Sequence, residues 1–149
     1  MRRVPVSARE KEATKQRAGY RCEYCQIAGW ELQVDHVLPR SPRNRSAGMT
    51  DEAPDSPENL AAACAHCNRL KGDLASGRDP VSGAEARLFN PRRDSWDEHF
   101  AWSDDFLRLL PLTPIGGATI ARLKMNAPIL KRQRRLLRQA IIGGASPWP

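Results

Sequence analysis

The 149-residue sequence lacks any apolar run approaching the roughly 18 residues that a membrane-spanning helix needs. Its mean hydropathy of −0.60 points the same way, so we expect no membrane association. The N-terminal string MRRVPVSAREKEATKQR also lacks the apolar segment of a secretory signal, which predicts a cytoplasmic protein. There is no internal repeat and no low-complexity tract. The length fits one compact domain with an appended arm, but not two full domains.

Basic residues exceed acidic ones. The chain has 24 Lys and Arg against 17 Asp and Glu, a formal charge of +7. Such an excess indicates a polyanionic partner, and nucleic acid is the commonest one, although charge alone does not decide it.

Cysteine is scarce, but its four copies are paired. Cys22 and Cys25 form one C-x-x-C pair, and Cys64 and Cys67 form a second. In a reducing compartment this pattern favours metal binding over disulfides. Four thiolates close a tetrahedral Zn²⁺ site and leave no position for a substrate, so we predict structural zinc that stabilises a unit of about 70 residues. Reduced core cysteines or redox dithiols are the alternatives, although no thioredoxin-like βαβ pattern surrounds either pair.

The first half of the chain predicts a helix and then a strand. Ser7 and Glu10 form a capping-box pattern, which starts a helix that runs through Arg17 and stops at Gly19. Apolar and polar residues alternate over residues 30–36, which is typical of a strand ended by Pro39, with Asp35 and His36 on opposite sides. Residues 40–57 contain three prolines and predict a long surface loop.

The second half of the chain predicts a connector followed by a helical segment. Residues 79–105 predict a partly irregular connector, and residues 106–149 a helical segment. Its last part is amphipathic: Leu130, Leu137 and Ile141 share one face. The basic residues Lys131, Arg134, Arg135 and Arg138 lie mostly elsewhere on this helix. They form either a DNA-contacting face or the solvated side of a helix docked on the rest of the protein.

The strings GYRCEYC, VDHVLPRS, ENLAAACAHCN and RLKGD occur in that order over about residues 15–75. In this order they resemble the HNH endonuclease family in its four-cysteine, zinc-containing form. The resemblance implies an α+β protein with a ββα-metal core, in which two antiparallel strands and a helix grip a divalent cation. Residues 59–63 would then belong to the second strand, against their local helix propensity. We therefore expect a nuclease core over residues 1–78 and a connector with a basic helical extension over residues 79–149.

Site residues follow from the resemblance, position by position. His36 would be the general base, Asn59 the residue that orients it, and Asp35 and Asn68 the ligands of the catalytic cation. The family usually has His where this chain has Asn68. One carboxylate and one amide oxygen form a hard site that favours Mg²⁺ or Mn²⁺ over Zn²⁺.

These expectations describe a DNA phosphodiesterase. A neutral imidazole can take a proton from water near neutral pH, and the family resemblance implies products with 5′-phosphate and 3′-hydroxyl ends. Arg69 and Lys71 either contact phosphates or form a solvated helix face. His66 is expected to pack near the zinc site or face DNA, and His99 to be structural among nearby aromatic residues. The alternative function is a zinc-stabilised nucleic-acid-binding module without catalysis, because Asn68 departs from the usual motif.

Overall fold

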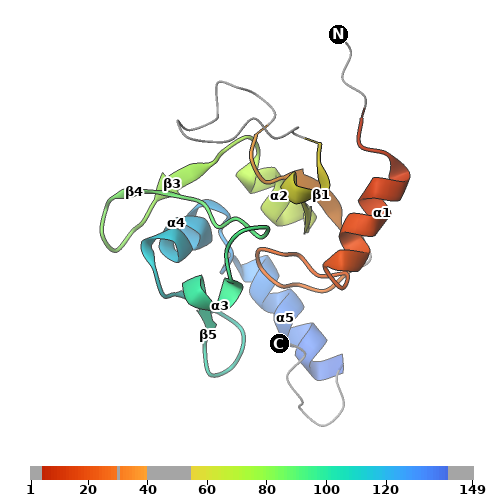
Figure 1. The fold of residues 1–149 in the computed structure, drawn as a ribbon. Helices are drawn as coiled ribbons and strands as arrows, with labels where there is room; N and C mark the ends of the chain where they lie inside the picture. The colour runs from red at the N-terminus through yellow and green to blue at the C-terminus, as the bar shows by residue number, and fades with distance from the viewer. Residues whose placement is uncertain (1–4, 30, 40–54, 141–149) are drawn as a thin grey trace.

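The computed structural model describes residues 5–29, 31–39 and 55–140, and these form an α+β protein (Figure 1). The first part contains α1 (Ala8–Arg17), β1 (Gln33–His36), the short 3-10 helix η2 (Pro57–Asn59), β2 (Leu60–Ala63) and α2 (Ala65–Lys71). The second part contains β3 (Ser76–Arg78), β4 (Glu85–Arg87), α3 (Trp96–His99), β5 (Phe100–Trp102), β6 (Leu109–Pro111), α4 (Pro114–Arg122) and α5 (Pro128–Ala140).

The predicted capping box begins α1. The Ser7 side chain accepts a hydrogen bond from the Glu10 amide, and the Glu10 carboxylate accepts one from the Ser7 amide, which satisfies two helix-terminal donors. Gly19, just after the C-cap, adopts a left-handed φ of 64°, so the expected stop is confirmed.

β1 and β2 pair as an antiparallel ladder. Asp35 lies opposite Ala61, and His36 lies opposite Leu60. β2 is alanine-rich and would favour a helix in isolation, but all four of its residues are buried. Packing by α1 and α2 and pairing with β1 decide its conformation, which confirms the expected strand. β1 begins at Gln33, so it is shorter than the strand predicted over residues 30–36.

α2 follows β2 directly and completes a ββα unit. Cys64 is its N-cap and accepts a hydrogen bond from the Cys67 amide through its sulfur. Gly72 ends the helix with a φ of 50°. α2 packs on both strands of the ladder, so residues of β1 and α2 lie close together.

The connector is more regular than predicted. β3 and β4 form one antiparallel hairpin, β5 and β6 form another, and α4 packs on both. Strands of three residues are too short to show a period in the sequence, which is why they were not foreseen. Figure 1 shows β3 and β4 at the opposite side of the molecule from α1.

The expected aromatic cluster is present around α3 and β5. The ring of Trp96 lies 5.2 Å from Phe100 and 5.6 Å from Trp102, measured between centroids. His99 is buried against Phe89 and bonds to Thr113 through Nδ1, so its structural role is confirmed.

Residues after 78 pack on the ββα unit. Trp96 donates from Nε1 to the carbonyl of Tyr24 at 3.0 Å. His66 donates from Nε2 to the carbonyl of Leu123 at 2.9 Å, which ties α2 to the turn after α4. One buried cluster includes residues from both parts. None of the helices in the described ranges is both long and apolar enough to cross a bilayer.

Candidate active site and zinc centre

The four cysteines converge on one point. Their sulfur atoms all lie within 4.8 Å of one another, and Cys25 Sγ is 3.7 Å from Cys64 Sγ. A tetrahedral ion with Zn–S bonds of about 2.3 Å requires sulfur separations of roughly 3.8 Å. Three of the four side chains are fully buried, and Cys64 is partly exposed. The cluster therefore fits a structural zinc ion, as the spacing predicted.

The surroundings of two of the four thiols shift their pKa values upward. Hydrogen bonding to Cys22 and Cys64, together with burial, raises the pKa of the Cys25 thiol well above its ordinary value. Hydrogen bonding to the other three sulfurs and burial also raise the pKa of Cys67. A divalent cation would allow all four cysteines to bind as thiolates.

A second site lies where β1 meets α2. Asp35 and His36 from β1 and Asn68 from α2 line one pocket of about 380 Å³, together with Val34, Arg69, Gly72 and Asp73. Three of the four residues proposed for the catalytic site thus share one cavity, although they come from segments more than 30 positions apart.

Asp35 is held inside a polar network. Tyr24 donates its hydroxyl to Asp35 Oδ2 at 2.6 Å, and the Lys71 ammonium lies 3.2 Å from Oδ1 and 3.1 Å from Oδ2. Only 4% of Asp35 is exposed, and that small fraction borders the pocket. Burial raises the pKa of the Asp35 carboxyl, and the ammonium of Lys71 opposes that rise.

Asn68 is oriented by Gln33. Its Nδ2 donates to Gln33 Oε1 at 2.7 Å, across the gap between α2 and the start of β1. Within the described part of the chain its oxygen accepts no hydrogen bond. An amide oxygen without a hydrogen-bond donor on the rim of a polar pocket is available to a hard cation.

His36 is paired with a residue that the sequence did not single out. Its Nε2 lies 2.7 Å from Oδ1 of Asp55, just before η2. The His36 side chain is 21% exposed and that of Asp55 is 37% exposed. Asp55 sits at the end of a proline-rich polar stretch, and no local pattern distinguishes it from the other acidic residues there.

The side chain of Asn59 bonds to the backbone of Leu38. Its Oδ1 accepts from the Leu38 amide at 2.8 Å, and its Nδ2 donates to the Leu38 carbonyl at 3.1 Å. Its own carbonyl accepts from the Val37 amide. These bonds fix the backbone that leaves β1. An orienting contact from Asn59 to the His36 ring stays a prediction.

Two of the side chains expected to contact DNA are buried. Lys71 is 1% exposed, because it reaches inward to Asp35 and to the carbonyl of His36. Arg134 is fully buried, donates to the carbonyls of Leu107 and Cys25, and lies 5.4 Å from the ring centroid of Trp102. Neither side chain can reach a phosphate. Arg69, Arg135 and Arg138 are exposed, and Lys131 is half-buried.

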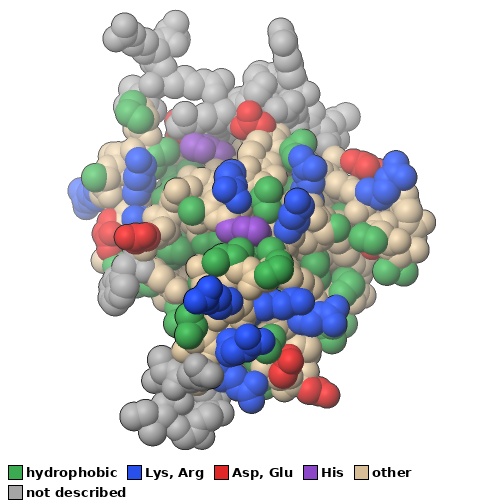
Figure 2. Space-filling view, turned by 180° about the vertical axis from the view of Figure 1, so that it is seen from behind, with side chains coloured by type: hydrophobic (Ala, Val, Ile, Leu, Met, Phe, Trp, Pro, Cys, Tyr) green, Lys and Arg blue, Asp and Glu red, His purple; other side chains and the backbone are tan. Residues whose placement is uncertain are grey.

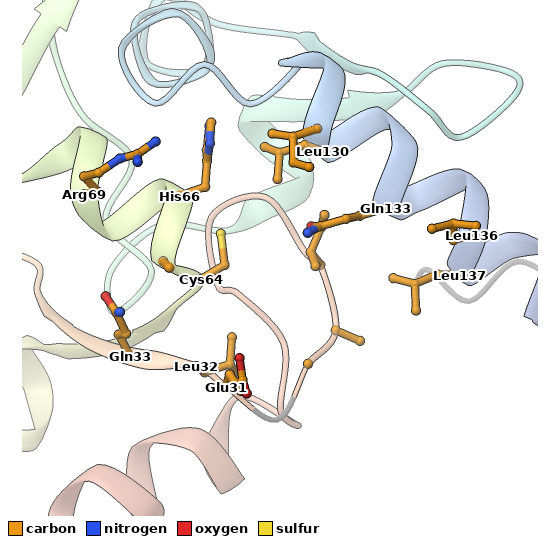
Figure 3. Close-up of a pocket in the computed structure, with 15 residues that line it drawn as sticks. Glu31, Leu32, Gln33, Cys64, His66, Arg69, Leu130, Gln133, Leu136 and Leu137 are labelled. Atoms are coloured by element: carbon orange, nitrogen blue, oxygen red, sulfur yellow. The ribbon is translucent and has the colours of Figure 1, made fainter.

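A larger groove of about 950 Å³ runs beside the polar pocket, between α2 and α5 (Figure 3). Its walls are mainly apolar and include Leu32, Leu130, Leu136 and Leu137. Arg69 lines both cavities, so the groove and the polar pocket share a border. Ile141, the third residue of the predicted apolar face of α5, lies outside the described residues.

Residues 22–74 match the family model of the HNH endonucleases. We call this segment, which is similar to HNH endonuclease domains, the HNH domain. It spans both cysteine pairs, the β1–β2 ladder and α2. The comparisons found no matching curated protein and no matching solved structure. The match over residues 22–74 suggests a nuclease-type function.

The polar pocket of the HNH domain has donors suited to a hard divalent cation. Asp35 offers a carboxylate and Asn68 an amide oxygen, while the remaining volume accommodates water ligands. The Lys71 ammonium contacts both oxygens of Asp35. Each carboxylate oxygen has more than one lone pair, so Asp35 can still bind a cation as a further partner.

Proposed function

We propose that the HNH domain is a metal-dependent endonuclease that hydrolyses DNA phosphodiester bonds. One observation carries the proposal: the pocket in which Asp35, His36 and Asn68 meet. It combines a base, a carboxylate and an amide oxygen in a space open to solvent, and the family model covers all three residues.

His36 acts as the general base in this proposal. Its imidazole takes a proton from a water molecule in the pocket, and the resulting hydroxide attacks phosphorus while the bond to the 3′ oxygen breaks. The carbonyl of His36 is held by Lys71, so the backbone that carries the base is fixed.

Asp35 and Asn68 would hold Mg²⁺ or Mn²⁺. When bound, such an ion supplies Lewis-acid stabilisation of the charge that develops on the leaving oxygen. Tyr24 keeps the Asp35 carboxylate in place, and Gln33 keeps the Asn68 amide in place, so both donors are oriented before a cation arrives.

DNA would approach over α2 and α5. Figure 2 shows one face of the molecule on which Lys and Arg side chains gather around two histidines. The cations that remain candidates for phosphate contacts are Arg69, Lys131, Arg135 and Arg138. Arg138 also donates to the carbonyl of Asp105, which limits its reach. Such contacts bind the backbone of DNA without reading its sequence.

The test is nicking of supercoiled plasmid by the full chain, with Mg²⁺ or Mn²⁺ and after chelation. We expect metal-dependent nicking that His36→Ala lowers by on the order of a hundredfold or more. Asp97→Asn is the control, because Asp97 is an exposed residue of α3 that does not line the pocket, so the rate should be unchanged.

An alternative outcome would favour the second candidate, a nucleic-acid-binding module without catalysis. The observation behind it is the buried ion pair of Lys71 with Asp35, which reduces the negative charge available to a cation. Salt-sensitive DNA binding without nicking in any metal would establish that candidate and contradict the nuclease proposal.

A further inference from the structure

The side chains of His36, which lines the polar pocket, and Asp55 form a hydrogen-bonded pair. Nε2 of the imidazole and Oδ1 of the carboxylate are 2.7 Å apart. An ionised carboxylate can only accept, so the shared proton belongs to Nε2. In that tautomer the lone pair of the ring lies on Nδ1.

We propose that Asp55 is the positioning residue of the general base: it fixes the tautomer and orientation of His36 so that Nδ1 faces the attacking water. This inference rests on the proposed nuclease function. It assigns to Asp55 the part that the sequence had given to Asn59.

The backbone around the pair is fixed from several directions. His36 is in register with Leu60 on β2, and its carbonyl accepts from Lys71. On the other side, the Asn59 amide donates to the carbonyl of Ser56, which closes the turn that follows Asp55. The hydrogen bond to Asp55 restricts rotation of the imidazole about its own side-chain bonds.

The charge of Asp55 serves the same step. When Nδ1 takes a proton from water, the ring becomes a cation. A carboxylate at 2.7 Å stabilises that cation, as paired carboxylates do in other histidine-dependent hydrolases. Since the side chains of both residues are partly exposed, the pair contributes little to folding. Removing Asp55 should therefore change catalysis and leave stability nearly unchanged.

The kinetic test compares Asp55→Ala with Glu58→Gln in plasmid nicking by the full chain. Glu58 is an exposed carboxylate on η2, so its variant controls for loss of one negative charge near the DNA. We expect Asp55→Ala to lower kcat by about tenfold or more, with KM within about twofold. Asp55→Asn should lie between wild type and alanine, because an amide oxygen still accepts from Nε2. A kcat of Asp55→Ala equal to that of Glu58→Gln, or an effect confined to KM, would overturn the proposal.

A spectroscopic test separates the pair from the chemistry. ¹⁵N chemical shifts of the His36 ring should report the Nε2–H tautomer in wild type and a mixture in Asp55→Ala. Identical shifts in the two proteins would overturn the pairing whatever the kinetics. If His36→Ala nicks DNA at the wild-type rate, the proposed role of His36 in catalysis is wrong; a tautomer change would then still support orientation of the ring by Asp55.

Discussion

Lys71 and Asp35 form a buried ion pair that joins the last turn of α2 to β1. The ammonium is 1% exposed and the carboxylate 4% exposed, and they approach to 3.1 Å. Asn68 lies three residues before Lys71, so both project from the same side of α2. The contact that holds Asp35 therefore also sets where Asn68 lies relative to it.

Lys71→Met should destabilise the protein strongly, because it leaves the Asp35 carboxylate buried without its cation. We expect a loss of about 3–5 kcal/mol in the free energy of unfolding, measured by urea denaturation. The double variant Asp35→Asn with Lys71→Met should recover part of that loss. Arg69→Met, on an exposed position of the same helix, is the control and should change stability by less than about 0.5 kcal/mol. Equal effects of the two single variants would contradict the ion-pair interpretation.

Cys64→Ser should remove both zinc and stable folding. The cluster joins the turn after α1 to the start of α2, so losing the metal would release both segments from each other. We expect about one zinc per chain in the wild type and less in the variant, measured by atomic emission, together with loss of the cooperative thermal transition. Wild type treated with a chelator and then given zinc should regain the transition. A variant that keeps the wild-type Tm would rule out structural zinc.

The N-terminal helix and the ββα core could be predicted because their signals are local or ordered along the chain. A capping box fixes the start of α1, and the cysteine pairs bracket the two strands. The partners of Lys71 and Arg134 could not be predicted. The sequence pattern of a basic residue on a helix is the same whether its side chain faces water or a buried oxygen. Arg134 reaches Cys25 across 109 positions of sequence. Asp55 was missed for the same reason: only the fold brings it to His36.

Arg134 and Arg135 are neighbours on α5 with opposite expected effects. Arg134 is buried beside the zinc centre, where burial lowers its pKa and the four cysteine sulfurs oppose that change. A zinc ion bound to four thiolates carries a net negative charge, so we expect Arg134 to compensate it. Arg134→Met should lower Tm by several degrees and accelerate zinc loss to a chelator, while DNA binding of the folded fraction stays the same.

Arg135→Met should weaken DNA binding and leave stability unchanged. Its side chain is exposed, so Tm should not change. The affinity for DNA should fall, and the slope of log K against log salt should decrease by about one. Fluorescence anisotropy at several salt concentrations measures both quantities. A lower Tm for Arg135→Met, or a reduced salt slope for Arg134→Met, would contradict the division between a buried and a DNA-facing side of α5.

Asp94 should make part of the stability depend on acid pH. Partial burial opposes ionisation, but the bidentate contact with Arg87, at 2.6 and 2.9 Å, and a bond from the Asn90 amide hold the pKa of Asp94 below its ordinary value. A carboxyl whose pKa is lowered by folding stabilises the native state above its unfolded pKa of about 3.9, and this contribution disappears as pH falls through the folded value. Asp94→Asn should therefore be less stable than wild type by about 1 kcal/mol at pH 7, with the difference shrinking below about pH 4.

Urea unfolding at a series of pH values measures this difference in the free energy of unfolding. Asp97→Asn, at an exposed position on α3, is the control. A difference between Asp94→Asn and wild type that stays constant from pH 7 to pH 3 would show that the contribution comes from packing rather than from the charge of Asp94.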